Sequence, residues 1–251
     1  MRVMSFNLLC FGEGENIMKK RRGIAVEKIQ ELQPDLLGVQ EATPEWMKWL
    51  KAKLKDYDFV GVGRDNGKNK GEYSAIFYLH DKYTPISSGT FWLSQTPEKP
   101  SMGWDAACKR VCTWAIFEEK STGKRLAHMN THLDHRGPEA RKNGIDLILK
   151  KALKLDAYPL VVTGDFNLLE GSEEYEQLMA GTLKDSKFLA EDTMDTGTFH
   201  HFGKSGDVKV IIDYVLVNDK FKPSLYKVET QGVDGRPVSD HYPVYSDMEP
   251  L

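Results

Sequence analysis

Polar residues able to bind a metal ion or carry a proton stand within, or at the ends of, six short apolar segments of the chain. Catalytic groups are commonly found where a rigid strand meets a loop, because the sheet holds them in place. We therefore interpret these residues as one candidate site. They are Asn7, Glu41, His132, Asp165, Asn167, Asp213, Asp240 and His241.

The residue types in this set favour phosphoryl chemistry. Asn, Glu and Asp offer hard oxygen donors, which suit Mg²⁺ or Mn²⁺ better than zinc or copper. Such an ion neutralises phosphate oxygens, while a nearby histidine or aspartate handles the proton of water. A serine nucleophile elbow is absent from the sequence. The glycine-rich segment 61–71 lacks the G-K-[ST] ending of a phosphate-binding loop.

Several of these residues also have a purely structural interpretation. Asn7 could cap a turn, Asp165 could be a turn acid, and His132 could be a buried structural histidine. Asp213 differs, because it lies inside the apolar run VIIDYVLV, where an unpaired carboxylate is costly. A histidine or metal partner would remove that cost.

Strand-like and helix-like segments alternate along the chain and would position these residues. Helical periodicity and capping residues predict helices over residues 19–33, 43–54, 137–152 and 173–180. Apolar and β-branched runs predict strands over residues 2–9, 35–41, 72–79, 110–119, 125–133, 158–166, 208–219 and 237–247. This alternation by itself hints at a parallel sheet. The longest irregular stretches, 61–71 and 94–109, are polar and lysine-bearing, as functional loops are.

The bulk composition narrows the class of protein. A length of 251 residues with 40% hydrophobic residues suits one large domain over residues 1–251 with a sizeable core. The net charge of -3 does not fit a protein that binds nucleic acid non-specifically, although a local basic groove is compatible with it.

The sequence gives few signs of targeting. Three cysteines are too few for a disulfide framework, so we expect a reducing compartment, the cytoplasm. Cys108 and Cys112 lack the nearby ligands that zinc would need. A run of about 18 apolar residues is absent and a strand-like segment follows Met1, so we expect neither a membrane span nor a signal peptide.

Seven motifs, taken in order, resemble the endonuclease/exonuclease/phosphatase superfamily, whose fold is that of deoxyribonuclease I. They run from residue 5 to residue 244 and read SFNLL, VQEA, GEYSAIFY, NTHLDH, GDFN, IDYVLV and SDHYPV. Segments 89–114 and 130–141 are similar to a small bacterial subgroup. The resemblance implies a four-layer α/β sandwich, in which two mostly antiparallel β-sheets pack face to face with helices outside.

The resemblance also implies roles at a metal centre. Glu41 resembles the principal Mg²⁺ ligand (or Mn²⁺ ligand), helped by Asn7 and Asp240. Asp165 and Asn167 match the pair that orients the attacking water and the scissile phosphate.

The same resemblance implies two histidines that act on the phosphate. His241 would contact the phosphate with Asp213 as its carboxylate partner. His132 would be the second histidine, with Glu72 as its orienting acid. Arg110 fits a phosphate-binding arginine.

The substrate is left open by the sequence. Trp92 and Trp104 beside Arg110 could stack a base or sugar, or could simply pack their loop. The first hypothesis is a Mg²⁺-dependent phosphodiesterase acting on nucleotide ends or a small phosphorylated metabolite or sugar. Alternatives are a DNA or RNA endonuclease or exonuclease, including a deadenylase-like enzyme, and a catalytically inactive phosphate-binding protein. The complete residue set disfavours the last, and an obligate protein partner is not expected.

Overall fold

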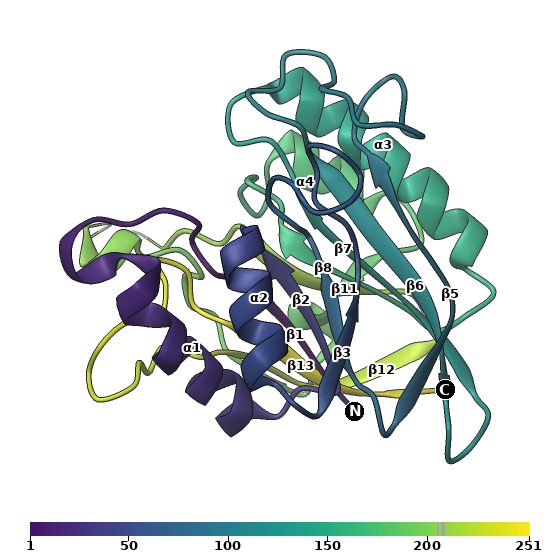
Figure 1. The fold of residues 1–251 in the computed structure, drawn as a ribbon. Helices are drawn as coiled ribbons and strands as arrows, with labels where there is room; N and C mark the ends of the chain where they lie inside the picture. The colour runs from purple at the N-terminus through teal and green to yellow at the C-terminus, as the bar shows by residue number, and fades with distance from the viewer. Residues whose placement is uncertain (205, 207–208) are drawn as a thin grey trace.

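Two β-sheets face each other in the computed structural model, and helices cover their outer sides (Figure 1). The structure describes residues 1–204, 206 and 209–251. Both sheets mix parallel and antiparallel strands, and three hydrophobic clusters fill the space between the layers. The expected four-layer sandwich is confirmed, and the parallel sheet suggested by the alternation of elements is replaced by mixed sheets.

The first sheet has the strand order β10-β12-β13-β1-β2-β4-β3. The pairs β1–β2 and β10–β12 are parallel, and the others are antiparallel. Its strands are β1 (Arg2–Asn7), β2 (Leu36–Gln40), β3 (Tyr57–Val60), β4 (Ile76–Leu79), β10 (Asp192–Thr193), β12 (Phe221–Val228) and β13 (Val244–Pro250).

The second sheet has the order β5-β6-β7-β8-β11-β9, and only β7–β8 is parallel among its described pairs. Its strands are β5 (Tyr83–Trp92), β6 (Val111–Glu119), β7 (Arg125–His132), β8 (Leu160–Asp165), β9 (Lys184–Asp185) and β11 (Asp213–Val217).

Helices on the two outer sides bury the remaining apolar faces of the sheets. One cluster joins α1 and α2 to the first sheet, and another joins α3 and α4 to the second. The described helices are α1 (Met18–Leu32), α2 (Pro44–Lys53), α3 (Pro138–Leu155), α4 (Glu173–Met179) and α5 (Ser186–Leu189), with the short turns η1 (Gly14–Asn16) and η2 (His201–Gly203). Among the described residues, none of them is long and apolar enough to cross a membrane.

Residues alternate between the two sides of the central strands. In β1, Met4 and Phe6 pack in the cluster under α1 and α2, whereas Val3 lies in the cluster between the sheets. Ser5 and Asn7 follow Val3 on that inner side and are fully buried. The interior between the sheets therefore changes from apolar to polar toward the carboxyl end of β1.

A buried polar seam, formed by Gln40, Asn130 and Thr163, joins the two sheets. The Asn130 amide nitrogen donates to the carbonyl oxygens of Val39 (2.9 Å) and Ala75 (3.0 Å). Its oxygen accepts from Gln40 Nε2 (2.7 Å) and Thr163 Oγ1 (3.0 Å). Because Asn130 lies on β7 and Gln40 on β2, these bonds fix the position of one sheet against the other.

Most predicted elements are present, with shifted ends. The strand predicted over 72–79 is regular only over Ile76–Leu79, and the last one begins at Val244. The strand predicted from residue 208 starts at Asp213, and Val208 itself lies outside the described residues. The sequence did not predict the strands β3, β5 and β12. Both β5 and β12 carry a proline where the strand register shifts, and β5 lies at the edge of its sheet, so neither has the residue pattern of a regular central strand.

Gly38 provides a test of the packing between the sheets. A Cβ at this position would collide with Thr163 Oγ1 and Asn130 Oδ1 of the polar seam. We expect Gly38→Ala to lower the free energy of unfolding by about 1–3 kcal/mol, because overpacking forces the seam apart. Urea denaturation measures this change.

Gly23, in the interior of α1, is the matched control. A Cβ there meets nothing within 4 Å. Gly23→Ala should raise the free energy of unfolding by about 0.5–1 kcal/mol, because alanine is the better helix former. Equal stabilities of the Gly38→Ala protein and the wild type would contradict the close approach of the sheets.

Candidate active site

The polar ends of the central strands meet in a cleft of about 520 Å³. In the first sheet β1 and β2 run parallel, and in the second sheet β7 and β8 run parallel, so the carboxyl ends of each pair lie together. The strand β11 runs antiparallel to β8, which places the start of β11 at the same edge. The cleft is lined by Cys10, Phe11, Glu41, Arg64, Glu72, Cys108, Arg110, His132, His135, Asp165, Asn167, Phe199, Ile212, Asp240 and His241.

The cleft gathers most of the residues singled out in the sequence. Eight of them line it, namely Glu41, Glu72, Arg110, His132, Asp165, Asn167, Asp240 and His241. Asn7 and Asp213 are buried and hydrogen-bonded to lining residues. Trp104 is not among the lining residues; its backbone N–H approaches Gln95 Oε1 (3.4 Å) instead.

Two lining residues adopt left-handed backbone conformations directly after their strands. Glu41 follows β2 with φ of 56°, and Asn167 follows β8 closely with φ of 49°. Asparagine tolerates this region better than glutamate does. Strain of this kind collects at functional sites, where it aims a side chain that regular strand geometry would point elsewhere.

Asn7 connects the two sheets at the bottom of the cleft. Its Nδ2 donates to Glu41 Oε1 (3.2 Å) from the first sheet and to Asp165 Oδ2 (2.9 Å) from the second. Its Oδ1 accepts from the backbone N–H of Leu9 (3.0 Å), which can only donate and so fixes the amide orientation. In this geometry Asn7 holds two carboxylates together, and its expected role as a metal ligand stays a prediction.

Glu41 is kept ionised by its surroundings. Burial opposes the charged form, but the backbone N–H of Cys10 (2.7 Å to Oε2), the Cys10 thiol and the Asn7 amide outweigh it and lower the pKa of Glu41. A carboxylate that is charged near neutral pH and still half-exposed to the cleft is well suited to bind a cation.

His241 and Asp213, predicted to be partners, are in hydrogen-bond contact. His241 Nδ1 lies 2.8 Å from Asp213 Oδ2, and its Nε2 lies 3.7 Å from Asp165 Oδ2. Burial opposes the imidazolium, but Asp213 and Asp165 outweigh it and raise the pKa of His241, so the ring is protonated at neutral pH. Burial and the charge of Asp213 raise the pKa of Asp165.

His132 stays neutral, and Glu72 does not orient it. Burial, Arg110 and Arg64 hold the pKa of His132 well below its usual range. Its Nε2 lies 3.4 Å from Asp165 Oδ2, while its buried Nδ1 has no hydrogen-bond partner among the described residues. Both Glu72 oxygens instead accept from the Arg64 guanidinium at 2.7 Å, which corrects the expected Glu72–His132 pairing.

Two guanidinium groups line the cleft, and one of them was missed in the sequence. Arg64 lies in the glycine-rich loop 61–71, which lacks the ending of a phosphate-binding loop and drew no residue-level prediction. The buried ring of Trp92 fixes this loop by donating from Nε1 to the Arg64 carbonyl (2.7 Å). The lysines of this loop were the feature of the sequence that could have indicated an anion-binding segment. They would have indicated the loop as a whole and not Arg64 in particular.

Asp134 organises the turn between β7 and α3 and supports Arg110. Its Oδ1 accepts from the N–H groups of Arg136 (2.9 Å) and Gly137 (2.8 Å), and its Oδ2 accepts from Ala107 N–H (3.1 Å) and Arg110 Nε (3.4 Å). Burial opposes ionisation, but these three N–H groups and the Arg110 charge lower the pKa of Asp134 to about 2.

The acids of the cleft fit a divalent cation. Four carboxylates line it against two guanidinium groups, and burial and repulsion by Glu41 raise the pKa of Asp240. Asp213 Oδ1 is buried without a hydrogen-bond partner in the described part of the chain. Asp165 and Asp213 each place one oxygen within 4.8 Å of a His241 ring nitrogen, and the protonated ring already offsets part of their negative charge. A bound cation would relieve this excess of negative charge.

Comparison with known proteins gives consistent matches over the whole chain. Residues 4–241 match the Endonuclease/Exonuclease/phosphatase family. The uncharacterized protein L388 of Acanthamoeba polyphaga mimivirus is 27% identical over 241 residues, covering 92% of this chain and 84% of that protein. Nocturnin of Xenopus laevis is 26% identical over 223 residues, covering 76% of this chain but 54% of the longer protein.

Among solved structures, a mannosyl-6-phosphatase of Bacteroides thetaiotaomicron is similar over its full length. It shares 34% sequence identity with this chain, with a TM-score of 0.93 and 99% of both chains covered. The expected similarity to a bacterial group is in line with this match.

The lowered pKa of Asp134 predicts a pH-dependent contribution to stability. The ordinary pKa of this carboxyl is 3.8 and its pKa in the folded protein is about 2. Its contribution to the free energy of unfolding is therefore present above pH 4 and is lost as the pH falls through 2. We expect Asp134→Asn to be less stable than the wild type at pH 7 by about 1–2 kcal/mol, allowing for solvent screening. Urea unfolding at a series of pH values should show this difference shrinking between pH 4 and pH 2; a difference constant with pH would refute the assignment.

Proposed function

The chain belongs to the endonuclease/exonuclease/phosphatase family, and we propose that it is a phosphatase that depends on a divalent metal ion. We propose further that its substrate is the phosphate monoester of a small polyhydroxylated molecule, such as a sugar phosphate. Members of the family are phosphoric ester hydrolases, so the proposal concerns which ester is cleaved. It keeps the small phosphorylated metabolite or sugar of the first hypothesis and replaces the phosphodiesterase of that hypothesis with a phosphate monoesterase.

The observation that carries the proposal is the pairing of two guanidinium groups with metal-type carboxylates in one small cleft. Arg64 and Arg110 face the same space as Glu41 and Asp240. A terminal phosphate monoester carries close to two negative charges, one more than a diester, and two guanidinium groups bring matching positive charge to the cleft. Arg64 does so while paired with Glu72, and Arg110 while paired with Asp134. The cleft volume of about 520 Å³ is that of a small-molecule site.

Similarity supports the same substrate class. The Bacteroides protein that is 34% identical over 99% of the chain is described as a mannosyl-6-phosphatase. A nucleic-acid polymer is less well matched, because a protein with a net charge of -3 offers little general attraction to a long run of phosphates. A pure binding protein would not need the proton carriers Asp165 and His241.

Glu41 and Asp240 are the residues that would hold the metal ion, and their oxygen donors suit Mg²⁺ or Mn²⁺. When bound, the ion supplies positive charge to the phosphoryl oxygens as negative charge builds up on them. Asn7 keeps the Glu41 carboxylate in place through its 3.2 Å hydrogen bond and keeps the Asp165 carboxylate nearby through a bond of 2.9 Å.

The remaining residues act on water and phosphate. Asp165, whose pKa is raised, accepts a proton of the attacking water as the water oxygen bonds to phosphorus. The bond between phosphorus and the alcohol oxygen breaks, and the departing alcohol oxygen takes up a proton from solvent in the open cleft. The Asn167 N–H donates to Asp165 Oδ1 (3.0 Å) and fixes its orientation. Protonated His241 donates to a phosphoryl oxygen, and the positive charges of Arg64 and Arg110 stabilise the negative charge on the others.

A substrate panel tests the proposal. With Mg²⁺ or Mn²⁺, we expect release of inorganic phosphate from hexose 6-phosphates and from p-nitrophenyl phosphate. Chelation by EDTA should abolish it, and added Mg²⁺ or Mn²⁺ should restore it, because the excess of acids repels the phosphate without a cation. Turnover of bis-p-nitrophenyl phosphate, plasmid or poly(A) without phosphate release from monoesters would replace the proposal with a nuclease. Absence of all turnover would favour a binding protein, and full activity in EDTA would refute the metal.

Single substitutions test the proton carriers. We expect Asp165→Ala and His241→Ala each to lower kcat by about 10²–10³-fold, the usual effect of removing a group that stabilises the transition state. Both proteins should keep the wild-type circular dichroism spectrum. His80→Ala, at an exposed histidine outside the cleft, is the control and should retain wild-type kcat. Wild-type rates in either cleft variant would remove that residue from the mechanism.

A further inference from the structure

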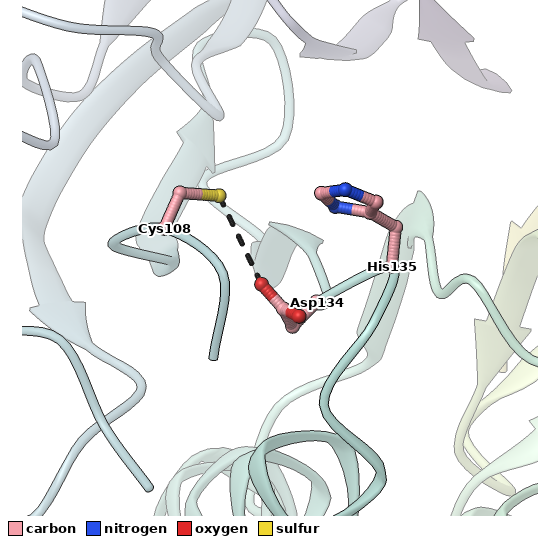
Figure 2. Close-up of side chains that lie close together, drawn as sticks. All are labelled: Cys108, Asp134 and His135. Carbon is pink, nitrogen blue, oxygen red and sulfur yellow. Dashed lines mark hydrogen bonds between the residues drawn. The ribbon is translucent and has the colours of Figure 1, made fainter. Parts of the chain in front are cut away.

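Cys108, Asp134 and His135 form a side-chain group at one wall of the cleft that the proposed mechanism does not use (Figure 2). One ligand atom from each lies within 4.8 Å of the others, and the Cys108 thiol approaches Asp134 Oδ2 (3.8 Å). A second metal is a poor match here, because Asp134 already accepts from three backbone N–H groups and the positive charge of Arg110 lies against the group.

Arg110 determines which ring nitrogen of His135 carries the proton. Arg110 Nη2 lies 2.9 Å from His135 Nδ1. A guanidinium nitrogen can only donate, so Nδ1 must be the acceptor and the neutral ring must carry its proton on Nε2. Burial and the Arg110 charge also lower the pKa of His135, which favours this neutral form.

The Nε2–H of His135 is therefore a neutral donor available to a ligand. His135 is exposed and lines the cleft, and Nε2 has no hydrogen-bond partner in the described ranges 1–204, 206 and 209–251. A neutral donor recognises a hydroxyl or ether oxygen, whereas the phosphate is matched by charged groups elsewhere in the cleft.

An exposed aromatic ring at the same cleft completes the chemistry. Phe11 lines the cleft and is 79% exposed, so its ring is open to a ligand. A sugar offers hydroxyl groups around its edge and an apolar face of C–H groups, so it suits a site with a neutral donor and an aromatic ring.

We infer that His135 and Phe11 form the subsite for the alcohol portion of the substrate, with His135 Nε2 donating to a hydroxyl or ring oxygen of a sugar. This inference rests on the proposed function, because it names the residues that select one phosphate monoester over another. Arg110 has two roles in it, since it faces the phosphate and fixes the tautomer of His135.

The test compares two substrates in the 251-residue chain with Mg²⁺. A hexose 6-phosphate presents hydroxyl groups to His135, and p-nitrophenyl phosphate does not. We expect His135→Ala to lower kcat/KM for the sugar phosphate by about tenfold, the equivalent of one good hydrogen bond, and to leave p-nitrophenyl phosphate within about twofold. His135→Gln keeps an N–H donor and should recover most of the loss.

Arg136→Ala is the matched control, because Arg136 is an exposed neighbour that does not line the cleft. It should leave both substrates unchanged. Equal losses on both substrates in His135→Ala would overturn the inference, since His135 would then act only by holding Arg110. Unchanged rates on both would overturn it too. If the wild type releases phosphate from neither monoester, the proposed function itself fails, and that outcome is separate from a failure at His135.

Discussion

The amide of Asn7 donates to one carboxylate from each sheet, and the geometry of the whole cleft depends on this bridge. Glu41 belongs to the first sheet and Asp165 to the second, so their distance is set by how the sheets pack. Two carboxylates this close would repel each other and spread apart without a donor between them. The neutral amide satisfies both without adding a positive charge that would compete with a cation. The Leu9 N–H holds the amide in the orientation that makes this possible.

This bridge continues a change in the nature of the interior between the sheets. At one end the facing strands meet through apolar side chains, in the middle through the polar seam of Gln40, Asn130 and Thr163, and at the cleft through acids and histidines. The Asn130 amide is paired at both its nitrogen and its oxygen in this seam, so the seam specifies one relative position of the sheets. A purely apolar interface would allow one sheet to slide slightly over the other. A catalytic site divided between two sheets does not tolerate such sliding, because a displacement of about 1 Å is enough to impair catalysis.

Much of this arrangement could be predicted from the sequence, and the misses share a cause. Glu41, Asp165 and His241 were predicted because each follows or precedes an apolar segment, and such local patterns report which residues meet at a sheet edge. Side-chain partners were harder to assign: Glu72 pairs with Arg64 rather than His132, and the Asn7 oxygen faces Leu9. These pairings depend on distances between segments remote in the chain. Arg64 was missed for the same reason, and the edge strand β5 because its polar residues and Pro85 lack a strand's alternation.

The left-handed turns at Glu41 and Asn167 bear on how this protein can change over evolutionary time. Glycine would occupy either position with less backbone strain, so drift under selection for stability alone would favour it. Glutamate is disfavoured in this conformation, and asparagine, although better tolerated, is still less favourable there than glycine. We infer that selection for the two side chains keeps these residues in place. In a relative with the same fold, glycine at both positions would indicate a protein that is no longer under selection for catalysis. Such a protein would have less backbone strain and could be more stable.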